Sequence, residues 1–200
     1  MAKISNKDII DDLLKNHNHS WYTELYNRNK NNLDDVAILY RGTKITYKDL
    51  FDNILKYAKS LKKMGLGVDS EIPVCVSNSP EIVYIMGAAS MIGAKINIFG
   101  AHFPKDYITE IINSCNTNII FVEDNNYEVI SEAINNSKVK KIVMNSLCDS
   151  LENGIDPYID TEINPDLFNT KVDRLKQLDS RIVSQNDFIN YGNDYIGKTY

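Results

Sequence analysis

Apolar residues near the N-terminus recur at helical spacing and predict two short helices. The first begins at Ser5, and the second covers residues 20–29 and buries Trp21 and Leu25, with Tyr22 as a further candidate. The period then changes to that of extended chain, and residues 36–46 contain two short apolar runs separated by a turn. This pattern predicts a β-hairpin.

A longer helix and then a regular alternation follow the hairpin. Thr46 is predicted to cap this helix, which ends at Gly65. Four apolar runs of strand length come next, at residues 71–77, 94–99, 118–122 and 140–144. Three stretches of helical spacing and crossover length separate them. The fold class is therefore α/β, a parallel doubly wound sheet with flanking helices, preceded by short helices and a β-hairpin.

The regularity ends after Met144, where the chain becomes rich in Asp, Glu, Asn, Gly and Pro. Two further helices are predicted beyond this polar stretch, at residues 165–177 and 184–191. We expect three parts, listed by residue number: an N-terminal helical segment 1–35, an α/β subdomain 36–145, and an irregular connection with short helices 146–200.

Composition and charge exclude several classes of protein. The formal net charge is -5 and the pI is about 5.2, so nothing favours nucleic acid or an anionic membrane as a partner. No apolar run is long enough to span a membrane, and the polar N-terminus does not resemble a signal peptide. The 3 cysteines are widely spaced and odd in number, which does not suggest a disulfide framework. We expect a cytoplasmic protein.

Motifs for phosphate or metal binding are incomplete. The turn at residues 65–67 follows a helix and has Ser70 where a third glycine would stand, which indicates a simple turn between helix and strand. Residues 192–199 match a phosphate loop only at their end. His17 and His19 could clamp a metal ion, but no third ligand is evident, and two solvated histidines explain them as well. We predict no catalytic residue and no metal site.

The loop at residues 99–104 is the strongest candidate for ligand contact. It follows the end of a predicted strand and precedes a helix, at the edge where open α/β sheets bind ligands. Gly100 and Ala101 are small enough for close approach, and His102 and Phe103 complete the candidate set. The other interpretation is a loop whose aromatic residues simply pack on neighbouring helices.

Several segments in order resemble the AMP-forming acyl-CoA synthetase and ligase family. The resemblance covers roughly residues 36–145. Its motifs are ITYKDL at 45–50, the glycine turn at 65–70, a strand leading into NSPE at 78–81, AASMIGA at 88–94, FGAHFPK at 99–105, which is similar to FGGFSPE, and IINSC at 111–115.

The resemblance implies an enzyme that activates a carboxylic acid with ATP and Mg²⁺ and passes the acyl group from an acyl-adenylate to coenzyme A or another thiol. It also implies that the phosphate loop, the nucleotide-binding motifs and the catalytic lysine lie downstream of residue 200. Two positions depart from the family pattern: Glu110 stands where an arginine contacts coenzyme A phosphates in some members, and Asn113 replaces an aspartate. We expect this chain alone to be catalytically inert and to bind none of these cofactors tightly.

Two other interpretations remain open. The chain could be a free-standing, non-catalytic α/β binding or scaffold module, or, less in keeping with its glycine pattern, a dinucleotide-binding domain. The continuation of the reading frame past Tyr200 separates the first of these from a ligase. If the chain is part of a larger enzyme, apolar surface normally covered by the rest is exposed, and self-association is expected.

Overall fold

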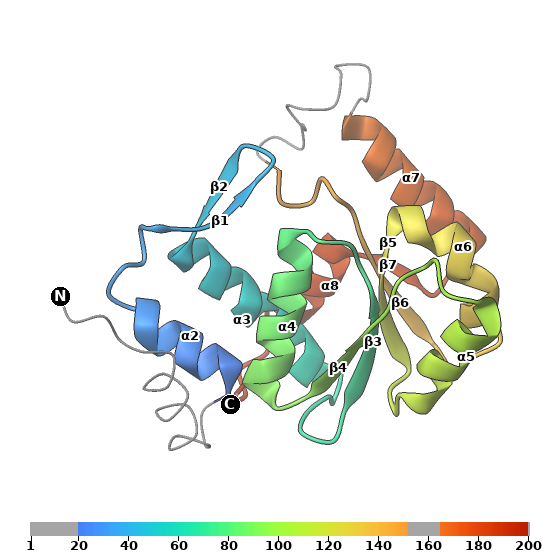
Figure 1. Ribbon diagram of the computed structural model, residues 1–200, viewed down its shortest axis with the longest axis horizontal. Coiled ribbons are helices and arrows are strands. Elements are labelled where there is room, and N and C mark those ends of the chain that lie inside the picture. Colours follow the sequence, from blue (N-terminus) through green and yellow to red (C-terminus); the bar gives the residue numbers. More distant parts are fainter. Residues whose placement is uncertain (1–19, 152–164, 200) are drawn as a thin grey trace.

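A parallel β-sheet forms the centre of the computed structural model, which describes residues 20–151 and 165–199 (Figure 1). The sheet has five strands in the order β4-β3-β5-β6-β7, and every pair is parallel. The strands are β3 Glu71–Cys75, β4 Lys95–Ile98, β5 Ile119–Glu123, β6 Lys141–Asn145 and β7 Ile182–Ser184. The predicted doubly wound α/β class is confirmed. The edge strand β7 was not predicted, because its three residues are too short to show a period.

Helices cover both faces of the sheet (Figure 1). On one face lie α3 Tyr47–Lys63, α4 Pro80–Ile92 and α8 Gln185–Gly192, and on the other lie α5 Lys105–Ser114, α6 Asp124–Asn135 and α7 Pro165–Leu178. Each face has its own hydrophobic core. The strands between the two layers are therefore apolar on both sides, as their continuous apolar runs predict.

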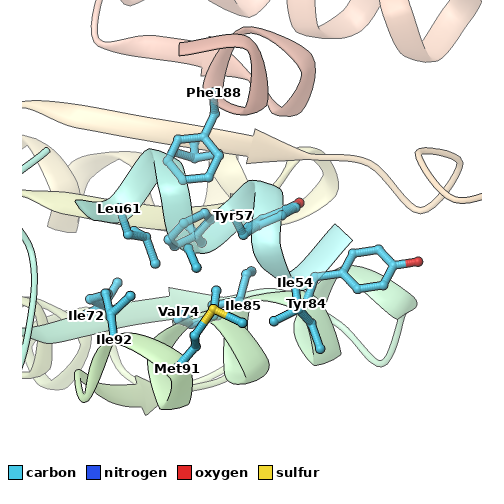
Figure 2. Packing of buried hydrophobic residues seen from close by; sticks show 14 of the residues in the cluster. Ile54, Tyr57, Leu61, Ile72, Val74, Tyr84, Ile85, Met91, Ile92 and Phe188 are labelled. Carbon is cyan, nitrogen blue, oxygen red and sulfur yellow. The ribbon is translucent and has the colours of Figure 1, made fainter. Parts of the chain in front are cut away.

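The two cores divide the residues of β5 by alternation. Phe121 belongs to the core under α3 and α4, whereas Ile120 and Val122 belong to the core under α5 and α6. On the first face, Tyr57 of α3 and Phe188 of α8 point toward each other, with ring centroids 5.4 Å apart (Figure 2). This contact makes α8 part of the core.

The hairpin lies outside the main sheet and leads directly into α3. Strands β1 (Val36–Tyr40) and β2 (Thr43–Thr46) pair antiparallel across a tight turn in which Arg41 and Gly42 have φ of 46° and 86°. Positive φ at both central residues is typical of the turn that suits the twist of a hairpin. Thr46 and Asp49 then form a reciprocal capping box at the start of α3, so the predicted hairpin and cap are confirmed.

Helix α2 (Trp21–Asn29) is present, but the prediction that it buries Trp21 is wrong. Trp21 is 44% exposed. Tyr22, the further candidate, does face inward: its backbone N–H donates to Ser90 Oγ at 3.0 Å and its ring packs edge-on against Phe51. The predicted helix that begins at Ser5 lies outside the described residues.

We predict that Phe188→Ala lowers the free energy of unfolding by about 3–5 kcal/mol, because it removes a fully buried ring and leaves a cavity beside Tyr57. Urea unfolding followed by circular dichroism measures the change. Leu178→Ala is the control, since Leu178 is 74% exposed and its loss is expected to cost less than about 0.5 kcal/mol. Equal effects of the two variants would contradict the placement of α8 in the core.

We predict that Asp179→Asn destabilises the chain at neutral pH. The Arg181 guanidinium donates to this carboxylate through Nε and Nη2, the Arg181 backbone N–H and the Tyr127 hydroxyl donate to it as well, and the Arg181 bonds above all lower its pKa to about 2. The stabilisation is present above the ordinary carboxyl pKa of about 4 and is lost as the pH falls through 2, so the variant costs on the order of 2 kcal/mol at pH 7 and little at pH 2. Unfolding measured across this range, with exposed Asp173→Asn as control, tests it. A cost independent of pH would contradict the ion pair as its source.

Candidate functional site

The order of the sheet reverses between β3 and β5. Strand β3 connects through α4 to β4 on one side, and β5 connects through α6 to β6 on the other. Because the two connections diverge, a crevice forms at the carboxyl ends of these strands, the place where open α/β sheets bind ligands. A cavity of about 420 Å³ opens there. It is lined by Val76, Ser77, Phe99, Gly100, Ala101, His102, Asn126 and Val129.

A tight turn after β4 shapes one wall of this cavity, and the Phe103 N–H closes it on the Gly100 carbonyl at 3.3 Å. The imidazole of His102 folds back over Gly100 so closely that a Cβ at Gly100 would overlap the ring. Only glycine therefore permits this position of the imidazole.

The structure separates the four candidate residues of the loop. Gly100, Ala101 and His102 line the cavity, and Phe103 does not. Phe103 is 39% exposed and packs between His102, at 4.8 Å between ring centroids, and Tyr107, at 5.6 Å. Its ring supports the imidazole from outside the cavity.

The other walls come from residues that the sequence analysis did not single out. Val76 and Ser77 follow β3, and Asn126 and Val129 lie on α6. The side-chain amide of Asn126 donates to the Cys75 carbonyl at 3.3 Å and so joins α6 to the end of β3. The available signal was their position at the carboxyl end of a predicted strand, for Val76 and Ser77, or shortly after one, for Asn126 and Val129, since the carboxyl ends of parallel strands meet at one edge.

The residues that line this cavity are mostly apolar or uncharged polar. Apart from His102, none of these described residues has an acidic or basic side chain. Burial, and to a lesser extent the carboxylate of Glu123, raises the pKa of the adjacent Cys75 thiol to about 12, so this cysteine stays protonated and is a poor nucleophile. Such a wall suits a narrow, uncharged chain better than a phosphate group.

A second cavity, of about 630 Å³, lies between the hairpin, α3, α4 and the loop after β6. Its wall is polar and includes Asp49, Asn53, Tyr84, Asp149, Ser150 and Gln185. Two acids stand close to it: Glu81 has no exposed surface, and this burial raises its pKa, whereas Asp149 lies on the cavity wall and is exposed, although the protein atoms around its carboxyl group raise its pKa to about 7. Two cavities therefore lie at this edge of the sheet, the smaller with a mostly uncharged wall and the larger with a polar wall that includes acids.

Other candidate chemistry is limited within the described ranges. In residues 20–151 and 165–199, no group of three His, Cys, Asp or Glu side chains is placed to hold a metal ion. No helix in these ranges is long and apolar enough to cross a membrane. The glycine turn at Gly65, with φ of 82°, closes α3 and precedes β3, as expected of a simple turn. His17 and His19 lie outside the described residues.

A doubly wound parallel sheet with a cavity at its switch point defines the fold class, and similarity to known proteins identifies the family. The family model of AMP-binding enzymes matches residues 25–185. The chain belongs to the AMP-binding enzyme family. Curated relatives include acetyl-coenzyme A synthetases of Dictyostelium discoideum, 28% identical over 48% of this chain and 15% of the relative, and of Brucella canis, 30% identical over 46% and 15%.

Solved structures share the fold at low sequence identity. Coronafacic acid ligase from Pectobacterium brasiliense has a TM-score of 0.65 at 14% identity over 88% of this chain and 30% of its own. A benzoate CoA ligase from Burkholderia xenovorans LB400 has a TM-score of 0.60 at 10% identity over 64% and 26%. The matched stretch is thus a small part of each relative's length.

We predict that Gly100→Ala displaces the His102 imidazole, since the added methyl group overlaps the ring. The ring protons of His102 should change chemical shift, because the imidazole moves relative to the Phe103 ring, and NMR on the chain measures the change. Ala101→Gly, which adds no atom, serves as control. Unchanged His102 signals in Gly100→Ala would contradict the packed position of the imidazole.

Proposed function

We propose that the chain forms the first α/β subdomain of an AMP-forming acid–thiol ligase. In the complete enzyme, a carboxylate attacks the α-phosphate of ATP, which gives an acyl-adenylate and releases pyrophosphate. A thiol then attacks the acyl carbon, and a thioester and AMP result. The family match over residues 25–185, with acetyl-coenzyme A synthetases among the curated relatives, carries this proposal.

The cavity at the switch point supports a role in guiding a substrate. Its wall is mostly uncharged, and its volume of about 420 Å³ accepts a slender chain such as an acyl group or the arm that carries the thiol. His102 supplies the one hydrogen-bonding ring among the residues that line it. We assign Gly100, Ala101 and His102 to this path and Phe103 to the support of the imidazole.

The described residues do not fit ATP or Mg²⁺ by themselves. The cavity wall has no lysine or arginine for phosphates, and no three-ligand group for a metal stands in residues 20–151 and 165–199. Residues 193–199, which include the partial phosphate-loop match, contain a turn at 193–194 and no helix. Nucleotide binding and catalysis are therefore assigned to parts of the enzyme beyond this chain.

The proposal covers three acceptors of the acyl group: coenzyme A, a carrier-bound thiol or an amine. Glu110, at the position where the family resemblance gives an arginine, is exposed on α5. Its negative charge would repel the phosphates of coenzyme A, so this contact is not assigned to the chain.

We predict that His102→Ala in the complete enzyme raises KM for the acyl or acceptor substrate several-fold, because the substrate path loses its hydrogen-bonding wall. The kinetics of thioester formation give the effect on each substrate. Tyr107→Phe is the control, since Tyr107 is half-exposed and lies outside the cavity. Unchanged kinetics in His102→Ala would remove the loop from the substrate path.

The first experiment is to sequence the gene past codon 200. The protein encoded by the complete reading frame and the 200-residue chain are then each assayed for carboxylate-dependent ATP–pyrophosphate exchange. A Ser/Thr/Gly-rich loop downstream, with exchange in the complete enzyme and none in the 200-residue chain, supports the proposal. A stop codon directly after Tyr200 would overturn it and favour a free-standing binding module.

A further inference from the structure

The larger of the two cavities, of about 630 Å³, has no part in the proposed substrate path. It has no lining residue in common with the smaller cavity. Its wall comes from segments that lie far apart in the sequence: the hairpin at residues 42–45, α3, α4, the loop after β6, and α8. Packing between these segments shapes the cavity before any ligand arrives, so the side chains on its wall decide what it can bind.

The loop after β6 presents a fixed carboxylate to this cavity. Residues 149–151 line it, and Asp149 is exposed. The Ser146 N–H donates to Asp149 Oδ2 at 2.8 Å, and from the hairpin the Tyr40 hydroxyl donates to the Leu147 carbonyl at 3.0 Å. A backbone N–H that donates to a carboxylate favours its ionised form. The other carboxyl oxygen, Oδ1, forms no hydrogen bond with a described residue and remains available to a ligand.

Two buried side chains stand directly behind the wall, each with an oxygen that lacks a partner among the described residues. Glu81 has no exposed surface; its Oε1 accepts a hydrogen bond from Ser150 Oγ, and its Oε2 is unpaired. Asn145 is 1% exposed; its amide donates to Gln185 Oε1 at 2.8 Å, and its Oδ1 is unpaired. Ser150 and Gln185 both line the cavity. Because Ser150 gives its one proton to Glu81, its oxygen can only accept a hydrogen bond from the cavity.

The electrostatic environment of Asp149 is negative. The charged groups that act on its carboxyl group are the acids Glu81 and Asp124. Lys44 is the cation among the residues that line the cavity, and it is not one of the groups that act on Asp149. Asp49, the second acid on the wall, is engaged by the cap of α3. The part of the wall around Asp149 therefore combines negative charge with hydrogen-bond acceptors.

We propose that this cavity binds a primary ammonium or guanidinium group, with the Asp149 carboxylate as its counter-ion and Ser150 Oγ as a second acceptor. Such a group has N–H donors and no acceptor, so it suits a wall on which acceptors prevail. The acids near Asp149 disfavour an anion such as a phosphate or a carboxylate. Two sources have this chemistry: a small amine, and a lysine or arginine side chain from the part of the enzyme beyond this chain. The second source rests on the proposed function.

The test uses n-butylammonium as the probe, added to the 200-residue chain in low-salt buffer. At about pH 8 the Asp149 carboxyl group, with its pKa of about 7, is ionised. The side-chain amide NMR signals of Asn53 and Gln185, which both line the cavity, report binding. We expect saturable shifts with a Kd of roughly 1–10 mM, and at least about tenfold weaker binding of 1-butanol, which has the same chain length and no charge.

A matched pair of variants locates the binding group. We expect Asp149→Asn to weaken binding of n-butylammonium about tenfold, since the amide keeps the size of the side chain and removes its charge. Asp106→Asn is the control, because Asp106 is exposed on α5 and does not line the cavity, and it should leave binding unchanged. Circular dichroism checks that each variant folds. If Asp149→Asn does not fold, the comparison of the two probes on the unaltered chain decides.

The complete enzyme then separates the two sources. Binding of the probe to both the complete enzyme and the chain identifies a free amine as the ligand, whereas binding to the chain alone identifies a basic side chain of the enzyme. A stop codon directly after Tyr200 would remove the second source and leave the binding test on the chain intact. The absence of saturable shifts at Asn53 and Gln185, equal affinity for 1-butanol, or undiminished affinity in Asp149→Asn would overturn the proposal.

Discussion

The burial of β5 on both faces is the constraint on which the structure depends. All five residues of this strand are buried, with Phe121 on one side and Ile120 and Val122 on the other. A strand with two apolar faces needs a helical layer on each, and right-handed crossovers through helices make its neighbours parallel. The hairpin and α2 attach outside this three-layer unit.

Parallel pairing gathers the polar groups of the chain at one edge. Glu123 ends β5, Asp124 begins α6 and Asn145 ends β6, and all three are buried. Asp124 is the first residue of α6, where the helix dipole favours a negative charge and offsets part of its desolvation. Asn145 donates to Tyr57 at 3.0 Å and to Gln185 at 2.8 Å, and thereby joins the sheet edge to α3 and α8. Apolar packing sets the layers, and hydrogen bonds at this edge fix how they meet.

The sequence predicted those features that depend on local period and local capping. The four longer strands, the hairpin and the Thr46 cap are set by neighbouring residues, so their patterns are visible along the chain. The loop at residues 99–104 was found for the same reason, by its place after a strand. The exposure of Trp21, the short strand β7 and the approach of Ser150 to Glu81 depend on contacts between distant segments. Such contacts leave no periodic signal in one sequence.

Glu123 interacts with residues at both cavities at the sheet edge. Its Oε2 accepts the Ser77 N–H at 3.1 Å, and Ser77 forms part of the wall of the smaller cavity. Its negative charge also opposes ionisation of Glu81, which fastens the loop on the wall of the larger cavity. Glu123, the last residue of the central strand β5, therefore holds part of the wall of the smaller cavity in place and acts electrostatically on the acid beside the larger cavity.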